Sequence, residues 1–183
     1  MKFEDRQFVL KNGKKCVLTP TVAEYAEEVI EYLKITAAES MFLLRYPDEI
    51  NYTLEGEVEI LNRLYEDEQT VMMLALVDGK VAGNGSISPI GGARRMKHRC
   101  SLAIALKEEY CGIGIGQKMM DYMAELAGRI GYEQIELGVM EGNERAKALY
   151  DKCGYVETGR NVDAFKYDDG SYCDEILMYK KCK

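Results

Sequence analysis

The sequence predicts an α/β fold of the α+β kind, in which about six to seven strands and about four helices form one domain over residues 1–183. Helical periodicity dominates the first 70 residues, and consecutive strand patterns follow from residue 71. Two further helical segments alternate with short strands after residue 114. Because 47% of the 183 residues are apolar, the chain can bury one substantial core.

Two amphipathic helices are predicted before residue 70. Thr21 and Glu24 have the spacing of a capping box, which marks a helix start. Apolar residues of this first helix recur with helical spacing at Val22, Tyr25, Ala26, Val29, Ile30 and Leu33. The second helix carries apolar residues on one side at Leu54, Val58, Leu61 and Tyr65. Between the two helices, Ser40–Pro47 contains a proline and adjacent aromatic residues, which favours a packed loop.

Three strands are predicted next. Val71–Val77 and Lys80–Ser88 flank the dipeptide Asp78-Gly79, which is typical of a two-residue turn in a β-hairpin. A basic, glycine-containing turn then leads into a third strand over Arg99–Leu106.

The C-terminal part alternates helices and strands. Apolar spacing predicts a helix over Ile115–Ile130 that stops at Gly131, and a short strand follows it at Gln134–Val139. The remaining elements are a helix over Asn143–Cys153 ended by Gly154 and two closing strands over Glu157–Tyr167 and Tyr172–Lys180.

The negative charge of the chain is concentrated near its N-terminus. Residues 1–70 hold fifteen acids and eight bases, whereas residues 71–183 hold sixteen of each, for a net charge of −7. An acidic surface repels nucleic acid and anionic lipid, so we expect a small-molecule amine or a basic peptide as partner, with neither nucleic acid nor a membrane. The alternative is that Glu24, Glu27, Glu28 and Glu31 form an ordinary solvated helix face.

Targeting and metal signals are both missing from the sequence. No segment approaches the roughly 18 apolar residues of a membrane helix, and the charged N-terminus does not resemble a signal peptide. We therefore expect a cytoplasmic protein. The six cysteines lie far apart without a C-x-x-C pair, which predicts neither a disulfide framework nor a zinc site, and no metal is expected.

A glycine-rich turn, Cys111–Gly116, precedes the third predicted helix. Its three alternate glycines allow successive backbone N–H groups to converge near a helix N-terminus, a geometry that binds phosphate or pyrophosphate. A P-loop is excluded because Lys118 is followed by Met119 and no hydroxyl residue. A dinucleotide fingerprint is disfavoured because the spacing is G-x-G-x-G and the turn comes after antiparallel hairpins.

A second motif follows at residues 143–155, with the pattern N-x-x-A-x-x-L-Y-x-x-x-G-Y. Together with the strand Leu102–Leu106 and the glycine turn, it resembles the signature of the GNAT acetyltransferase superfamily, particularly its small-molecule and ribosomal-protein-type members. The resemblance implies a central mixed, mostly antiparallel sheet flanked by helices. It also implies acetyl-coenzyme A (acetyl-CoA) as co-substrate. Residues 1–70 would supply the acceptor-side helices, and residues 71–183 the acetyl-CoA-binding core.

The resemblance also assigns roles to individual residues. Tyr150 would protonate the departing sulfur of coenzyme A as general acid, although a core tyrosine is the alternative. Asn143 would contact the cofactor arm, and it is equally suited to cap its helix. Backbone groups of Ile104, Ala105 and Leu106 would hold pantetheine, and amides of Cys111, Gly112, Ile113, Gly114, Ile115, Gly116 and Gln117 would hold the pyrophosphate. Lys152, with Arg145 and Lys147, is a candidate for the phosphates.

Two departures from the family pattern concern chemistry. The family has Gln or Arg where this chain has Cys111, so backbone contacts must suffice there. Some members carry a glutamate near the position of Cys100, and this chain does not. A general base must take a proton from the acceptor amine. The candidates are His98, the single histidine of the chain, and the carboxylates of Glu39 and Glu141.

The sequence therefore favours a GNAT-type N-acetyltransferase. It would move an acetyl group from acetyl-CoA to a primary amine, on a small cationic molecule or a protein N-terminus, by direct attack in a ternary complex. One alternative is a catalytically silent regulatory module that binds coenzyme A. Another is a nucleotide-binding oxidoreductase. Members of the family are often homodimers, so a homodimer is possible.

Overall fold

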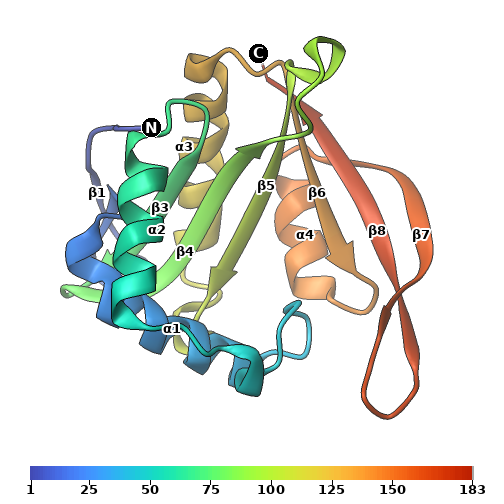
Figure 1. Ribbon diagram of the computed structural model, residues 1–183, viewed down its shortest axis with the longest axis horizontal. Helices are drawn as coiled ribbons and strands as arrows, with labels where there is room; N and C mark the ends of the chain where they lie inside the picture. The colour runs from blue at the N-terminus through green and yellow to red at the C-terminus, as the bar shows by residue number, and fades with distance from the viewer. Residues whose placement is uncertain (183) are drawn as a thin grey trace.

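A computed structural model describes residues 1–182, and in it eight strands form one sheet in the order β1-β2-β3-β4-β5-β6-β8-β7 (Figure 1). Neighbouring strands are antiparallel except β5 and β6, which are parallel. The predicted mixed, mostly antiparallel sheet is confirmed. The strands are β1 (Arg6–Val9), β2 (Lys15–Pro20), β3 (Val71–Val77), β4 (Lys80–Pro89), β5 (Arg99–Leu106), β6 (Gln134–Met140), β7 (Val156–Lys166) and β8 (Tyr172–Lys181).

The strand count exceeds the prediction because the first hairpin carries a weak sequence signal. β1 has only four residues and no alternation of buried and exposed side chains. β2 buries Cys16 and Leu18 on one face but ends in a proline, which sequence patterns disfavour within strands. The hairpin becomes stable because β2 pairs with β3 over five residue positions.

The helices cover both faces of the sheet. They are α1 (Ala26–Glu39), α2 (Leu54–Glu66), α3 (Ile115–Ile130) and α4 (Glu144–Lys152). Figure 1 shows α1 and α2 on one face and α3 and α4 on the other. The burial pattern agrees, since Leu74 and Leu76 of β3 pack with α1, whereas Met73 and Ala75 pack with α3. Within residues 1–182, none of the helices has the length and apolar composition needed to cross a bilayer.

The capping box predicted at Thr21 and Glu24 is wrong. The chain enters α1 through a 3-10 turn over Ala23–Tyr25, and no side chain within residues 1–182 caps the start of the turn or of the helix. Thr21 extends the edge of β2, where its N–H donates to the carbonyl of Met72 at 2.9 Å. Its hydroxyl is consequently buried without a hydrogen-bond partner among the described residues.

Two predicted chain reversals are confirmed. Asp78 and Gly79 have φ values of 51° and 78°, so the hairpin between β3 and β4 uses the positive-φ turn that an Asp-Gly pair favours. Helix α3 ends at Gly131, whose φ of 103° places it in the left-handed region used by helix C-caps. Both turns are determined by local sequence, which explains why short-range patterns predict them.

Candidate active site

The parallel strands β5 and β6 pair over only three positions and then separate. Their register joins Arg99 to Gln134, Cys100 to Ile135 and Ser101 to Glu136. Beyond Ser101, β5 continues for five more residues against β4 alone. Strand β6 likewise continues against β8 alone. Backbone groups along the two facing edges of this β5–β6 gap are therefore free to bind an extended ligand.

Residues of β5 present their backbone groups alternately to β4 and to the β5–β6 gap. The Ala105 carbonyl faces β4, because it accepts a hydrogen bond from the Tyr32 hydroxyl at 2.8 Å. The same hydroxyl accepts from the N–H of Asn84 at 3.2 Å, so Tyr32 of α1 inserts between two paired strands. Of the three residues predicted to hold pantetheine, Ile104 and Leu106 have backbone groups that face the gap.

The glycine turn leads directly into α3, and its glycines have different reasons to lack a side chain. Gly112 and Gly114 have φ values of 76° and 102°, a region that other residues rarely adopt. Gly116 has no such strain, but a Cβ there would lie 3.0 Å from a methyl group of Leu149. The turn is thus shaped both by backbone curvature and by the close approach of α4.

The start of α3 has the properties of an anion site. Gly114 is its N-cap and offers no side-chain cap, and the first turn contains no acidic residue. The backbone N–H groups of Ile115, Gly116 and Gln117 lie at the positive end of a 16-residue helix. They are available to an incoming phosphate or pyrophosphate.

Four side chains that could contribute to coenzyme binding near this turn differ in their surroundings. The thiol of Cys111 is directed at the carbonyl of Lys107, 3.6 Å away, rather than into the turn. Burial raises the pKa of this thiol, and the guanidinium of Arg145 partly opposes that shift. Lys147 is paired with Asp151 at 3.0 Å. Lys152 is exposed in the last turn of α4, and its predicted role stays a prediction.

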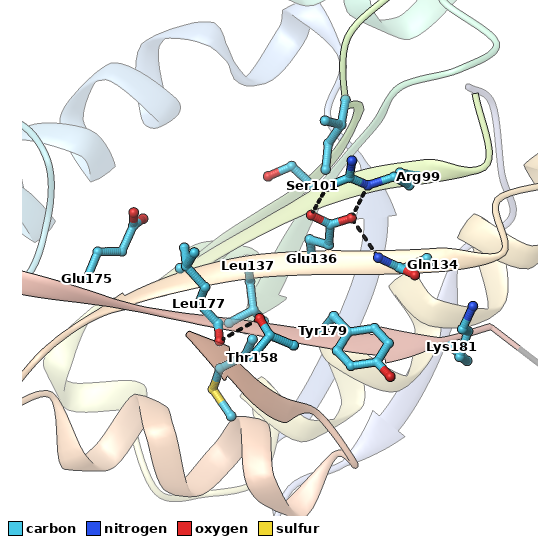
Figure 2. A pocket seen from close by; sticks show the side chains of 13 residues that line it. Arg99, Ser101, Gln134, Glu136, Leu137, Thr158, Glu175, Leu177, Tyr179 and Lys181 are labelled. Atoms are coloured by element: carbon cyan, nitrogen blue, oxygen red, sulfur yellow. Dashed lines mark hydrogen bonds and ion pairs between the residues drawn. The ribbon is translucent and has the colours of Figure 1, made fainter. Parts of the chain in front are cut away.

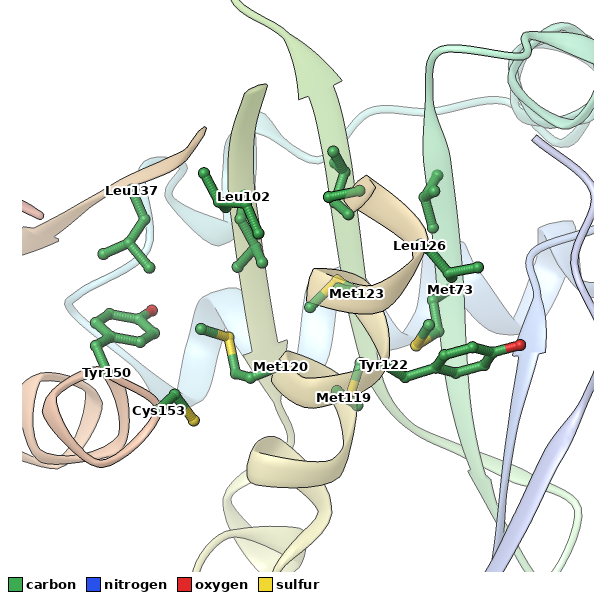
Figure 3. Close-up of a cluster of buried hydrophobic side chains, with 14 of the residues drawn as sticks. Met73, Leu102, Met119, Met120, Tyr122, Met123, Leu126, Leu137, Tyr150 and Cys153 are labelled. Atoms are coloured by element: carbon green, nitrogen blue, oxygen red, sulfur yellow. The ribbon is translucent and has the colours of Figure 1, made fainter. Parts of the chain in front are cut away.

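Helix α4 carries the two polar residues of the second motif. Asn143 caps the helix, since its side-chain oxygen accepts from the N–H of Ala146 at 3.2 Å. Tyr150 is 7% exposed, and Figure 3 shows its ring beneath Leu137 of β6, with the hydroxyl on the side that faces β5. Burial raises the pKa of Tyr150 to about 12. The phenol is therefore protonated at neutral pH, which is the form a general acid needs.

The opposite face of the sheet carries an open cavity of about 720 Å³ beside the β5–β6 gap (Figure 2). On its floor, Glu136 accepts two hydrogen bonds from Arg99, one of them 2.6 Å long, and a third from Gln134 at 2.9 Å. Glu175 lies at one end of the cavity and Lys181 at the other. Because strand residues alternate between faces, this cavity and the buried Tyr150 lie on opposite sides of the sheet.

The structure brings none of the three predicted general bases into the gap as a free group. His98 precedes the paired end of β5, roughly 20 Å of strand from Ile104. The carboxylate of Glu39 accepts from the N–H of Glu108 at 2.8 Å, which ties α1 to the loop after β5. Glu141 forms a surface ion pair with Arg160.

Glu175 lines the cavity, whereas Tyr32 and Asn84 meet between β4 and β5. The sequence did not predict a role for any of these three residues. One signal was available for Asn84, because it stands between Gly83 and Gly85 inside a strand, where glycine often marks a close approach. A Cβ at Gly83 would lie 2.2 Å from a methyl group of Leu106, and one at Gly85 would lie 2.8 Å from the sulfur of Met123. The side-chain amide nitrogen of Asn84 is buried without a partner among the described residues.

Comparison with solved structures places this architecture among acetyltransferases. A GNAT-family acetyltransferase from Streptococcus pneumoniae is 26% identical and superposes with a TM-score of 0.85, covering 91% of this chain and 99% of that one. A ribosomal-protein-alanine N-acetyltransferase from Brucella melitensis shares 19% identity and a TM-score of 0.79, covering 90% and 98% of the two chains. A putative acetyltransferase from Salmonella typhimurium, solved with its cofactor acetyl-CoA, shares 12% identity and a TM-score of 0.80, covering 92% and 94%.

The fold and the site define an enzyme class, that of acyl-CoA N-acyltransferases. The sequence model of the Acetyltransferase (GNAT) family matches residues 29–155, which is more than half of the chain. The chain therefore belongs to the GNAT acetyltransferase family. A search of curated protein sequences found no match.

Proposed function

We propose that this enzyme transfers an acetyl group from acetyl-CoA directly to a primary amine, on a small cationic molecule or a protein N-terminus. The observation that carries the proposal is the β5–β6 gap, which opens after three paired positions and leaves the backbone groups of Ile104 and Leu106 without strand partners. An extended arm with amide groups, such as pantetheine, suits this edge because it can replace the missing strand.

The groups around the gap support acetyl-CoA as co-substrate. The N–H groups at the start of α3 lie at the position where a pyrophosphate would meet the positive end of the helix. Arg145 adds a cationic side chain in the first turn of α4. Tyr150 supplies a protonated phenol for the sulfur that leaves as the C–S bond breaks. These residues bind and orient the thioester, and they need no metal ion or covalent enzyme intermediate.

The acceptor would approach through the face that carries α1 and α2. The acidic residues that suggested a cationic acceptor are exposed, with Glu24 in the 3-10 turn before α1 and Glu27, Glu28 and Glu31 along α1. They are therefore a solvated helix face and add only a long-range field that attracts cations. The loop between α1 and α2 reaches the last hairpin, where the N–H of Asp168 donates to the Tyr46 hydroxyl at 3.2 Å.

An amine panel tests the proposal. Purified protein is mixed with acetyl-CoA and with spermidine, an aminoglycoside, free amino acids or a basic peptide with a free N-terminus, and released thiol is measured. We expect thiol release with at least one of these amines. No release with any of them, while coenzyme A still binds by calorimetry, would instead identify a silent coenzyme A-binding module.

Replacement of Tyr150 by phenylalanine tests the assigned chemistry. We expect kcat to fall by about 100-fold, because general acid catalysis typically contributes factors of that order. The affinity for coenzyme A should remain, since the ring still fills its place beneath Leu137. An unchanged kcat in Tyr150→Phe would remove Tyr150 from the mechanism and leave it as a core residue.

A further inference from the structure

We propose that Glu175 of β8 is the general base that takes a proton from the acceptor amine. This inference rests on the proposed function. It assigns the one step for which none of the sequence-predicted candidates is suitably placed, because His98 lies at the paired end of β5 and Glu39 and Glu141 are engaged elsewhere.

The carboxylate of Glu175 packs directly against the backbone of Gly138. Gly138 lies on β6, two residues past Glu136, the last position that pairs with β5. A Cβ built on Gly138 would lie 2.0 Å from Oε1 of Glu175 and 2.7 Å from its carboxyl carbon. The carboxylate thus occupies the space that any other residue at position 138 would fill. It stands at the point where the β5–β6 gap opens.

The carboxylate of Glu175 has one oxygen held by a hydrogen bond and one oxygen that can accept a proton. Oε2 accepts from the side-chain amide of Asn161 on β7 at 2.8 Å. Oε1 accepts no hydrogen bond from any residue in the part of the chain that the structure describes. By contrast, the nearby carboxylate of Glu136 is fully committed to Arg99 and Gln134. Glu175 is partly exposed and lines the cavity, so an amine can reach it.

The positions of Glu175 and Tyr150 on opposite faces of the sheet match the two proton transfers. Glu175 shares its face with Leu177 and Tyr179, which line the cavity, while Ile176 and Met178 face the core that contains Tyr150. A thioester held between β5 and β6 would therefore meet the acceptor from one face and release its sulfur toward the other. The charged groups facing the cavity near Glu175 are the Arg99–Glu136 pair on β5 and β6 and Lys181 on β8.

In the proposed reaction the acceptor nitrogen loses two protons. An acceptor ammonium gives one proton to Oε1 of Glu175, and the nitrogen lone pair then forms the C–N bond to the acetyl carbon. As the C–S bond breaks, its electron pair leaves on sulfur, which takes a proton from the Tyr150 hydroxyl. The second proton lost by nitrogen restores the tyrosine through solvent, and Glu175 releases its proton to solvent. The net products are the amide, free coenzyme A and one proton.

Two variants test this assignment, with acetyl-CoA and whichever amine of the panel gives the fastest thiol release. Glu175→Gln keeps an oxygen that can accept from Asn161 but removes the basic group, so we expect kcat to fall by about 100-fold. Gly138→Ala places a methyl group where Oε1 lies and displaces only the end of a flexible side chain. We expect a folded enzyme with a similar loss of kcat.

Glu133→Gln is the matched control, because this exposed glutamate just before β6 has the same charge and lies at the paired end of the strands. It should turn over at the rate of the unaltered enzyme. Coenzyme A affinity should be equal in all variants. A raised KM with unchanged kcat in Glu175→Gln would overturn the proposal, because it would assign Glu175 to binding alone. Unaltered turnover in both site variants would overturn it as well. Failure of the unaltered enzyme to acetylate any amine would instead reject the proposed function.

Discussion

The two sides of the β5–β6 gap are assembled from the sequence in different ways. On the proposed coenzyme side, the glycine turn, the start of α3 and Tyr150 come from one segment of 40 residues, 111–150. The proposed acceptor side is the face of the sheet that carries α1. There, Tyr32, Asn84 and Glu175 come from a helix and two strands spread over 144 positions, 32–175. A cofactor that stays constant can be bound by a local motif, whereas a variable acceptor surface is built from distant segments.

The two sides keep their geometry through different interactions. The coenzyme side relies on backbone conformation, with positive φ values at Gly112 and Gly114. The acceptor side relies on side chains that join separate elements, as Tyr32 does between β4 and β5. Substitutions on the two sides should therefore have different effects: those that break links between elements should lower stability, and those that strain the turn should also weaken coenzyme A binding.

Tyr32→Phe should be the most damaging change to stability. The hydroxyl of Tyr32 satisfies both the N–H of Asn84 and the carbonyl of Ala105, and the side chain is 1% exposed. Its removal leaves two backbone groups unsatisfied, which should lower the free energy of unfolding by about 2 kcal/mol. Urea denaturation measures this loss. Tyr132→Phe is the control, because its hydroxyl serves only the carbonyl of Gln69 at 2.9 Å and should cost about half as much. Equal losses would show that Tyr32 is an ordinary core tyrosine.

The same contrast explains what the sequence predicted. The Asp78-Gly79 turn, the glycine turn and the α4 motif depend on neighbours within a few residues, so their patterns were visible and their elements were confirmed. Glu175 was missed because its position over Gly138 depends on the register of β6 with β8, and no local sequence pattern encodes that register. Tyr32 was missed because helical periodicity marks a buried face without showing which side chain reaches a strand.

Gly114→Ala tests the coenzyme side. Alanine at a φ of 102° is strained, so we expect the free energy of unfolding to fall by about 1–2 kcal/mol, together with a weaker affinity for coenzyme A. Gly128→Ala is a matched control in the same helix, where the φ is ordinary and a Cβ would have no atom within 4 Å. It should stabilise the protein by about 0.5–1 kcal/mol and leave coenzyme A affinity unchanged. Denaturation and calorimetry on both variants give the comparison. A loss of coenzyme A affinity in Gly128→Ala would mean that α3 as a whole, not its first turn, governs binding.

Glu141→Gln should have the smallest effect, and it completes the comparison on the acceptor side. Glu141 and Arg160 form an ion pair whose side chains are 51% and 42% exposed, so its loss should change the free energy of unfolding by less than about 1 kcal/mol. Turnover should be unchanged, because the carboxylate is held at the surface beside β7 rather than over the gap. Steady-state kinetics of Glu141→Gln and Glu175→Gln, measured in parallel, show which of the two carboxylates acts as the general base. A fall in kcat for Glu141→Gln, with full activity in Glu175→Gln, would identify Glu141 as the general base. It would reject Glu175, beside Gly138, in that role.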